Sequence, residues 1–556
     1  MSAADVTPNA TGGGAMQLAT RWLAPAALLL VLAMQLPLVL NRAINWDEFW
    51  HYSQTVLLAQ GNLRDPLQTL YTRAFVWVTS LEGTGVDHII VIRLFMLACE
   101  LVTLAAIIGL ARRFADRNTA WLCALAYLSA SYVFQHGTSF RFDPPAAALL
   151  TSSLWILACR PLTARWLMLV GLLTGLSTLL TIKSVLYAPA FAGLAWLRWS
   201  ELGLRREIAL RISAIPVLAL AAFGIAYLLH SQGLAGDTGS AAGTVVSRSA
   251  EKMFSFGVPP YWLATVRAAV FSPLQAILIL AVPIALLFSK RPMPERLALL
   301  GLWLPMTTLW FYHNTAPYYH VFLLAPVSVS LTAIIPAAAK RFGAPLLAIL
   351  LFAGAILTLM REPENTIDKQ RKLLVAAEQI FGGPVAYFDS CAMIGQFPKA
   401  NAFLTPWGIH QYLRGGFPAM SDIVDTKVVP LVVDDDYMFA EALNTREAVP
   451  TLLPRDTQML RSTYVRFWGP FWVAGFDLAA DSAERKIAVR VPGPYTLHGQ
   501  APMTIDGVMH KPGAVFNLAR GEHTVAPTAQ GGRLIWGRNL KAPAGPAPAE
   551  PFFMLF

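Results

Sequence analysis

The sequence contains few cysteines and few charged residues. Cys99, Cys123 and Cys159 lie in apolar stretches, Cys391 stands alone among polar residues, and these are the 4 cysteines of the chain. Because they offer neither a disulfide framework nor a Cys-x-x-Cys spacing, redox chemistry and a cysteine-held metal are not expected. Charged residues make up 14% of the chain, against about 25% in soluble proteins. A wholly soluble protein is therefore excluded.

The sequence also has no concentrated basic patch, and a cleavable leader is not expected. The formal net charge is +10, but the basic residues fall in short clusters between apolar stretches, which is not the pattern of a nucleic-acid-binding protein. Residues 1–20 lack the basic flank and the small-residue cleavage site of a secretory signal. We therefore expect residues 1–20 to form a flexible N-terminus and the first apolar run to remain as a membrane span.

Long apolar stretches dominate what the sequence does contain. Hydrophobic residues account for 55% of it, and the mean hydropathy is +0.50. A membrane span needs about 20 mostly apolar residues, and this criterion predicts about 11 transmembrane helices. The predicted spans are 23–40, 89–110, 119–136, 145–160, 166–181, 183–198, 209–230, 265–288, 297–313, 319–338 and 343–360. The expected fold class is a polytopic α-helical membrane protein.

Basic residues in alternate loops predict the orientation of these spans. Short loops rich in Arg and Lys remain in the cytoplasm, and the loops of this kind are 112–117, 160–165, 198–206, 290–296 and 340–341. The intervening loops 41–88, 137–144, 231–264 and 314–318 then face outward, as does everything after about residue 361. In loop 41–88 the apolar spacing predicts two short amphipathic helices at the membrane interface. The Gly- and Ser-rich segment 232–260 is expected to be mobile.

The composition changes near residue 364 to that of a soluble domain. A helix near 366–381 and extended stretches at 385–389 and 428–433 predict an α/β layer. Short alternating strands separated by turns over about 472–540 predict a β-sandwich. The expected divisions are a transmembrane domain at 21–361, an outer α/β subdomain at 362–471 and an outer β-rich subdomain at 472–556.

Two adjacent carboxylates follow the first span, in the segment Asn45-Trp-Asp-Glu-Phe-Trp-His-Tyr52. Asn45 and Glu48 have the spacing of a helix capping box, which accounts for Glu48 and leaves Asp47 free to project. Ionisable residues at membrane depth are costly unless they are paired or solvated, so they are functional candidates. Asp47 is therefore a candidate catalytic carboxylate, with a purely capping role for the pair as the alternative.

Two more outward junctions carry charged residues. Asp143 follows Arg141 and precedes Pro144-Pro145, so it is either the start of the fourth span or a second carboxylate of the site. Lys183 lies between two apolar runs on the outward side, where it either extends to the interface or binds a phosphate as a compact charge.

The outward junction at 311–320 is dense in histidine and tyrosine. His313 and His320 are candidate ligands of a phosphate or a metal, although two histidines seven residues apart are a weak metal signal. Tyr318 and Tyr319 are also compatible with an aromatic belt at the interface. Since the topology brings all four junctions to one membrane face, we expect them to share one cavity.

The order of these motifs resembles the polytopic GT-C glycosyltransferases, particularly protein O-mannosyltransferases and lipid A aminoarabinose transferases. The resemblance covers about residues 20–360. It is carried by Asp47-Glu48, by Arg141-Phe-Asp143-Pro, by Gly171-Leu-Leu-Thr-Gly175 with Lys183 and Pro189, and by Tyr318-Tyr319 ahead of Pro326. Ile182, between the threonine and the lysine, departs from the family pattern and puts the register of Lys183 in doubt.

The resemblance implies an integral inner-membrane (plasma-membrane) glycosyltransferase. Such an enzyme moves a sugar from a polyprenyl-phosphate-linked donor to an envelope lipid, glycan or protein acceptor on the periplasmic face, with inversion at the anomeric carbon. By the same resemblance Asp47 is the general base, with Glu48 and Asp143 as further catalytic residues. The implied donor-phosphate residues are Lys183, Arg141, His313, Tyr319 and His320, and those for the acceptor or sugar are Trp46, His51 and Tyr52. No cofactor is required, and no metal ligand is assigned, although a divalent cation is compatible with the site.

Two other functions remain open from the sequence. A lipid or sugar transporter or flippase also has many spans and intramembrane charges, although transporters usually place these near the midplane. A non-catalytic envelope-assembly protein would use the β-rich domain to bind a polysaccharide.

Overall fold

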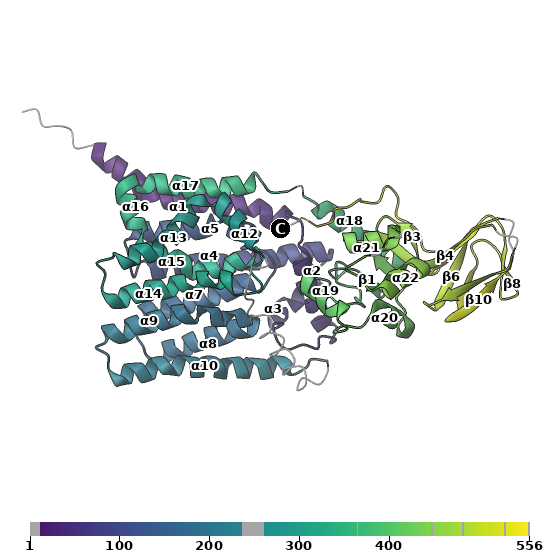
Figure 1. Ribbon diagram of the computed structural model, residues 1–556, viewed down its shortest axis with the longest axis horizontal. Coiled ribbons are helices and arrows are strands. Elements are labelled where there is room, and N and C mark those ends of the chain that lie inside the picture. Colours follow the sequence, from purple (N-terminus) through teal and green to yellow (C-terminus); the bar gives the residue numbers. More distant parts are fainter. Residues whose placement is uncertain are drawn as a thin grey trace, which may run out of the picture.

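The structure is a computed structural model that describes residues 12–235, 261–363, 365–445, 447, 449–480, 483–526 and 530–553. A bundle of long helices carries a mixed α/β domain at one end (Figure 1). Helices α2 (Trp46–Ala59), α3 (Thr72–Phe75) and α18 (Ile367–Phe381) lie at the junction of the two parts. The mobile segment expected at 232–260 falls almost wholly outside the described residues.

Each predicted span coincides with helical structure in the bundle. In chain order the elements are α1 (Gly12–Asn41), η1 (Val76–Ser80), α4 (Gly85–Ala111), α5 (Arg117–Leu128), α6 (Ser131–His136), α7 (Asp143–Cys159), α8 (Ala164–Leu180), η2 (Ile182–Tyr187), α9 (Ala188–Glu201), α10 (Arg206–Ser231), α12 (Trp262–Phe271), α13 (Pro273–Leu287), α14 (Met293–Trp303), η3 (Leu304–Trp310), α15 (Tyr319–Ser330), η4 (Leu331–Ala333), α16 (Ile335–Phe342) and α17 (Ala344–Leu359). Among the described residues, 3 helices are long and apolar enough to cross a membrane alone, or up to 5 if each bent pair is one span. A total of eleven spans stays a prediction.

Two of the predicted spans are bent. The chain turns by 108° between α12 and α13 and by 58° between the α15–η4 segment and α16, so the segments predicted at 265–288 and 319–338 are each broken into differently directed helices. Pro273 and Pro336 lie just after the two breaks. Proline lacks the N–H that a continuing helix needs and disfavours helical backbone in the residue before it.

The N-terminal expectation also needs correction. Helix α1 begins at Gly12, so residues 12–20 are helical rather than part of a flexible tail, while residues 1–11 lie outside the described chain. The apolar part that satisfies the criteria for a span begins at Trp22.

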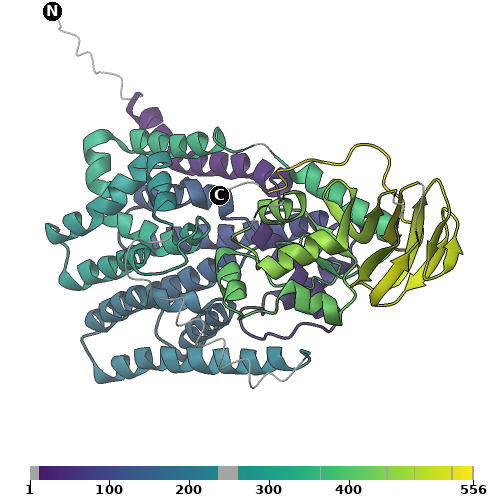
Figure 2. The same ribbon diagram turned by 45° about the vertical axis from the view of Figure 1, so that its right-hand side comes forward.

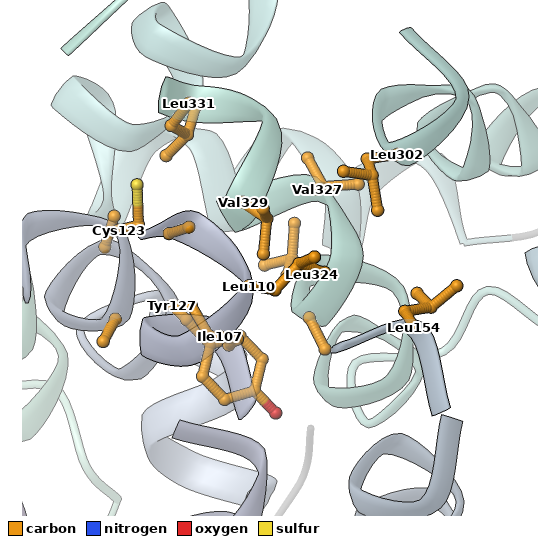
Figure 3. Close-up of a cluster of buried hydrophobic side chains, with 14 of the residues drawn as sticks. Ile107, Leu110, Cys123, Tyr127, Leu154, Leu302, Leu324, Val327, Val329 and Leu331 are labelled. Atoms are coloured by element: carbon orange, nitrogen blue, oxygen red, sulfur yellow. The ribbon is translucent and has the colours of Figure 1, made fainter. Parts of the chain in front are cut away.

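The core of the bundle is apolar and draws on helices that are distant in sequence (Figure 3). Residues labelled there come from α4, α5, α7, α14, α15 and η4, namely Ile107, Leu110, Cys123, Tyr127, Leu154, Leu302, Leu324, Val327, Val329 and Leu331. The Tyr127 hydroxyl donates to the Val321 carbonyl at 3.0 Å, which satisfies the polar tip of a fully buried ring.

The arginine-rich loops meet at the end of the bundle opposite the C-terminal domain (Figure 1). Arg113 pairs with Glu201, the Arg198 guanidinium donates to the Arg160 carbonyl at 3.2 Å, and the Arg291 guanidinium donates to the Phe114 carbonyl at 2.9 Å. These contacts join four of the loops for which the same membrane side was predicted. Their assignment to the cytoplasm remains a prediction.

The C-terminal domain contains helices and two sheets. After α18 its elements are β1 (Tyr387–Phe388), α19 (Pro406–Leu413), α20 (Met420–Thr426), β2 (Leu431–Val433), α21 (Tyr437–Asn444), α22 (Pro454–Thr463), β3 (Tyr464–Trp468), β4 (Phe471–Leu478), β5 (Arg485–Val489), β6 (Gly493–Gly499), β7 (Met503–Ile505), β8 (Val508–His510), β9 (Val515–Leu518), β10 (Gly521–Val525) and β11 (Gly532–Trp536). The larger sheet has the order β1-β2-β4-β11-β6-β9, with β3 also paired to β4, and the smaller sheet has the order β5-β10-β7-β8. Strands β1 and β2 are parallel, and the other pairs are antiparallel.

The larger sheet runs across the division expected between residues 471 and 472. Strand β4 pairs with β2 of the α/β part through Val473↔Leu431 and with β11 of the β-rich part through Asp477↔Arg533. The two sheets share a core that includes Leu478, Tyr495 and Leu534 of one and Ile487 and Val525 of the other. The β-rich part is thus a two-sheet packing, joined to the α/β part by a shared strand.

Helix α2 is buried on several faces, which corrects the expected amphipathic helix at the membrane interface. Tyr52 is fully buried, and a Cβ at Gly85 of α4 or at Gly395 of the C-terminal domain would lie about 3 Å or less from its ring. On another side of the helix, Trp50 stacks on Phe403 of the C-terminal domain with ring centroids 4.8 Å apart. The second expected helix is shorter than predicted and consists of α3 and the 3-10 turn η1.

The chain after β11 returns from the β-rich part to the bundle, where the C-terminal label lies in both ribbon views (Figures 1 and 2). We call residues 540–553 the returning tail. Phe553 packs edge-on against Trp46 and Phe49 at centroid distances of 6.3 and 6.1 Å. Gln370 of α18 donates to the carbonyls of Ile44 and Phe552, both at 2.8 Å. The tail therefore contacts the first turn of α2 directly.

Candidate active site

Four charged residues from three of the junctions predicted to face outward meet at the end of the bundle that faces the C-terminal domain. Asp47 lies in the first turn of α2, Arg141 in the turn before α7, Asp143 at the start of α7, and Lys183 in η2. We call these four residues the charge network.

The charge network is a continuous chain of ion pairs. The Arg141 guanidinium donates to an Asp47 oxygen through Nη1 and to Asp143 Oδ2 through Nε, the second at 3.3 Å. Lys183 Nζ donates to the other Asp143 oxygen, Oδ1. Acids and bases therefore alternate, so that each buried charge has an opposite charge beside it.

Exposure separates the two carboxylates of the network. The Asp143 side chain is 1% exposed, whereas the Asp47 side chain is 13% exposed. Asp143 is held from both sides by Arg141 and Lys183, while Asp47 has one cationic neighbour in the network. Asp47 is thus the carboxylate that a substrate can approach.

Aromatic rings surround the two cations of the network. The Arg141 guanidinium carbon lies 3.3 Å from the ring centroid of Tyr318. Lys183 Nζ lies 4.8 Å from the Phe142 ring and 5.5 Å from the Tyr319 ring. Aromatic faces attract cations and exclude water, so both side chains are held in place. Among these rings, Phe142 was not expected from the sequence.

Glu48 faces away from the charge network into a set of structural contacts. Its Oε1 accepts from Arg93 Nε at 2.8 Å and from the Phe140 N–H at 2.7 Å, and its Oε2 accepts from the Asn45 N–H at 3.0 Å and from Arg93 Nη2 at 2.5 Å. Burial by itself raises the pKa of the Glu48 carboxyl, but the charge and hydrogen bonds of Arg93 outweigh it and lower the pKa. Glu48 therefore caps α2, as the sequence predicted, and also ties α2 to α4 and to the loop before α7, so that it is placed to position Asp47.

His51 lies next to the charge network and is surrounded by aromatic rings. Its Nδ1 is 2.6 Å from the Tyr71 hydroxyl, and its ring packs against Phe142 at 5.3 Å. Burial, followed by the positive charges of Arg141 and Lys183, lowers the pKa of His51 well below its usual value. His51 is therefore neutral at neutral pH.

Tyr52 and Trp46, the other α2 residues predicted to bind the acceptor or sugar, pack against other parts of the protein. Tyr52 is fully buried and its hydroxyl is 2.6 Å from His88 Nδ1, so it packs α2 against α4. Trp46 is half-buried and contacts Phe553 of the returning tail.

The candidate phosphate ligands at 311–320 are spread over the junction. The Tyr319 hydroxyl is 2.7 Å from Thr308 Oγ1, and its ring faces Lys183. His320 Nδ1 is 3.1 Å from the Pro317 carbonyl, and its ring lies 5.1 Å from that of Tyr132. His313 is half-buried in the turn before α15. Of the three, the structure brings Tyr319 to the charge network.

A second tyrosine near Asp47 was not predicted as a site residue. Tyr261, directly before α12, lies close enough to Asp47 and Arg141 for both charges to act on its hydroxyl. The only signal for Tyr261 in the sequence was that it belongs to a group of aromatic residues before a predicted span.

A separate cluster of titratable residues lies in the C-terminal domain. Asp389, Cys391 and Asp435 are buried with candidate metal-ligand atoms within 4.8 Å of one another. Lys399 Nζ donates to Asp389 Oδ1 at 2.5 Å, and Ser390 donates to Asp435 through its N–H at 3.0 Å. Burial and then the neighbouring carboxylates raise the pKa of the Cys391 thiol well above its usual value. The hydrogen bonds from Lys399 and Ser390 to the two carboxylates make this cluster a hydrogen-bonded loop anchor.

Comparison with known proteins gives a family match over part of the chain. Residues 74–229 match the model of the family described as dolichyl-phosphate-mannose-protein mannosyltransferase. The matched segment includes Arg141, Asp143 and Lys183. No curated protein sequence matches the chain.

Solved structures extend the likeness to most of the chain. ArnT from Cupriavidus metallidurans, solved with bound undecaprenyl phosphate, aligns with a TM-score of 0.51 at 12% identity over 79% of this chain and 96% of that one. The oligosaccharyltransferase of Archaeoglobus fulgidus aligns with a TM-score of 0.48 at 14% identity over 81% and 73%. Arabinosyltransferase EmbB from Mycobacterium smegmatis aligns with a TM-score of 0.39 at 12% identity over 93% and 64%. The match to ArnT shows a shared fold, and the family match over residues 74–229 agrees with the resemblance to GT-C glycosyltransferases.

Proposed function

We propose that this protein is an integral-membrane glycosyltransferase that uses a polyprenyl-phosphate-linked sugar as donor and an envelope lipid, glycan or protein as acceptor. The observation that carries the proposal is the charge network, in which residues from three outer junctions form one chain of ion pairs beside the C-terminal domain. The family match over 74–229 and the fold shared with ArnT support the donor class.

In the proposed reaction Asp47 is the general base. An acceptor hydroxyl attacks the anomeric carbon of the donor while its proton moves to the Asp47 carboxylate, and the bond from that carbon to the phosphate oxygen breaks. Polyprenyl phosphate leaves with the electron pair, and direct displacement inverts the anomeric configuration. The residual exposure of Asp47 supports this role, because the base must reach the hydroxyl within hydrogen-bond distance.

Arg141 and Lys183 are proposed to stabilise the departing phosphate. Both are held by Asp143 and by aromatic rings, so their positive charges are fixed before the donor arrives. Fixed charges aimed at a developing negative charge need little reorganisation during the reaction. With these two cations in place we propose that the step needs no cofactor.

The location of the charges favours this function over its two alternatives. Transporters usually place charged residues at helix breaks near the membrane midplane, whereas this network lies at the bundle end next to the C-terminal domain. A non-catalytic assembly protein would not need a buried alternation of acids and bases in its bundle. We accordingly place the network on the periplasmic face of the inner membrane.

Replacement of Asp47 by Asn tests the proposal. Envelope glycans and lipids from cells that lack the gene would be compared by mass spectrometry with those from cells supplied with the wild-type or the Asp47→Asn protein. We expect the wild type to restore one defined sugar and Asp47→Asn to reduce it by roughly a hundredfold to ten-thousandfold, the usual contribution of a general base.

The matched control is Asp65→Asn, which removes an exposed carboxylate of the same outer loop. It should restore the sugar as the wild type does. Full activity of Asp47→Asn at equal membrane abundance would contradict the assignment of the base, and no change on loss of the gene would favour the alternatives.

A further inference from the structure

A groove rich in arginine lies in the C-terminal domain, far from the charge network. It has a volume of about 670 Å³ and lies between β3, β4 and β11 of the larger sheet and β5 of the smaller one. The cationic residues that line it are Arg461, Arg466, Arg485, Lys486, Arg490 and Arg533, and among the described lining residues the acidic one is Asp477. We call this site the basic groove.

Main-chain carbonyls orient two of the arginines without neutralising them. Arg461 donates through Nε to the Ala442 carbonyl and through Nη2 to the Glu447 carbonyl, both at 2.7 Å. Arg466 donates through Nε to the Gly469 carbonyl at 3.0 Å. These side chains are therefore held with their full charge, which lowers the entropy cost of binding a ligand.

Acidic side chains near the basic groove neutralise only part of its positive charge. Asp477 accepts a two-pronged contact from Arg533 at 2.5 and 3.1 Å. Lys486 pairs with Glu522 at 3.2 Å, and both side chains are 70% exposed. Arg490 pairs with Asp425 at 3.2 Å, and these side chains are 40% and 55% exposed. Such surface pairs contribute little. Cations that line one groove repel each other, and a bound anion relieves the repulsion.

The groove also has an aromatic wall. Trp472 and Phe476 are half-buried and line it together with the arginines. Arg466 lies directly opposite Trp472 in the β3–β4 register, so the two side chains share one face of the sheet. Guanidinium groups beside aromatic rings suit a ligand with anionic groups on an otherwise carbohydrate-like surface, because the forked donors match carboxylate and phosphate.

The place of the groove argues against a lipid surface as its ligand. In Figure 1 helices α18 and α21 lie between β3 and the bundle. A membrane headgroup held by the bundle's own bilayer therefore does not reach the groove, whereas a glycan chain extending from the membrane does.

We infer that the basic groove binds an acidic glycan, a chain of sugars that carry carboxylate or phosphate groups. Because the proposed function already includes an envelope acceptor, the inference deepens that function by naming the acceptor class as anionic carbohydrate. The groove would hold the chain while its end is presented to Asp47.

Binding by the full-length protein in detergent tests the inference without any transfer reaction. The probes are a galacturonate hexamer for carboxylate, glucose 6-phosphate for sugar phosphate, maltohexaose as a neutral sugar chain, and phosphatidylglycerol vesicles, all measured by titration calorimetry at two salt concentrations. The variants are the double variant Arg466→Ala/Arg485→Ala, the single variant Arg485→Glu, and Lys511→Ala as a control that removes an exposed positive charge outside the groove.

We expect at least one anionic sugar probe to bind the wild type, more weakly at higher salt, and maltohexaose not to bind. The double variant should weaken binding at least tenfold, and Arg485→Glu should weaken it too, while Lys511→Ala and Asp47→Asn should bind as the wild type does. Equal binding by wild type and both groove variants, binding of vesicles in place of sugars, or no binding of either anionic probe would each overturn the inference. Because Asp47→Asn is tested separately for transfer, failure here is distinguishable from failure of the proposed function.

Discussion

At the scale of single residues, Arg141 is the centre of the site. It contacts both carboxylates of the charge network and stacks on Tyr318. A bidentate, planar guanidinium can bridge two acids in a way that an ammonium cannot. The residue that joins the first outer loop to α7 is thus also the residue that fixes the direction of Asp47.

A second buried pair, Arg93 with Glu48, predicts a large loss of stability when it is broken on one side. The two side chains are 3% and 1% exposed. Arg93→Met leaves the Glu48 charge buried without a partner, and we expect a loss of about 3–5 kcal/mol, measured as a lower apparent Tm in detergent. The control Arg113→Met breaks a pair that is about 30% exposed and should cost less than about 1 kcal/mol.

The double variant Glu48→Gln/Arg93→Met should recover part of the loss, because it removes the unpaired charge. Equal apparent Tm values for Arg93→Met and Arg113→Met would show that the buried pair has no special role.

The sequence identified Asp47, Asp143 and Lys183 because ionisable residues at span ends are costly to keep without a purpose. Their meeting was predictable from the alternation of basic loops, which put all three on one side. Arg93 was missed even though it lies within the predicted span 89–110, where its charge was the available signal. The contact with Glu48 could not be predicted, because nothing in the local pattern says which of several acids an arginine will reach.

At the scale of elements, the packing of α8 against α10 depends on glycine. A Cβ at Gly175 would lie 2.4 Å from the Ala219 carbonyl and 2.8 Å from the Ala222 Cβ of α10. Gly171 of the same motif faces Leu218 at 2.4 Å. Small residues let two membrane helices approach closely. Gly171 and Gly175, which carry part of the family resemblance, therefore also allow α8 to pack against α10.

This close approach predicts opposite effects for two Gly→Ala substitutions. Gly175→Ala should push α10 from α8 and lower stability by about 1–3 kcal/mol through overpacking. Gly224→Ala, in α10 itself, has open space around the new Cβ and should be neutral or slightly stabilising, since alanine favours helix. Apparent Tm values of the two variants in the same detergent check this, and a loss for Gly224→Ala as large as for Gly175→Ala would contradict it.

Hydropathy located the helical segments but not their directions. The bends after α12 and before α16 have only Pro273 and Pro336 as signals, and a proline marks a break without giving an angle. The expected interfacial helix at 46–59 was misjudged for a related reason. Its apolar face was visible in the sequence, whereas its burial on other sides depends on Gly395 and Phe403, which follow it by more than three hundred residues.

At the scale of the whole molecule, the C-terminal domain is part of the architecture of the site. The returning tail places Phe552 and Phe553 on the first turn of α2, and Gln370 joins the tail to the chain at Ile44. The composition change near 364 revealed the domain, but a contact between the two ends of a chain leaves no trace in either local sequence.

Removing the aromatic contacts of the tail should reduce activity. In Phe552→Ala/Phe553→Ala a buried ring and its neighbour are lost, and truncation of a buried phenylalanine costs about 3–5 kcal/mol. We expect the tail to detach, limited proteolysis to cut after residue 540, and the sugar product to fall several-fold. Tyr437→Ala, which removes a ring that is 54% exposed, is the matched control, and resistance of the double variant to proteolysis at the wild-type level would exclude the attachment.

The returning tail also has a consequence for the order in which the protein is made. A ribosome releases α2 into the translocation machinery long before it reaches Phe552, so during most of synthesis the first turn of that helix lacks its final partner. The bundle would therefore insert before the first turn of α2 has these contacts, and Asp47, the proposed base, would acquire them only after Phe553 has been made.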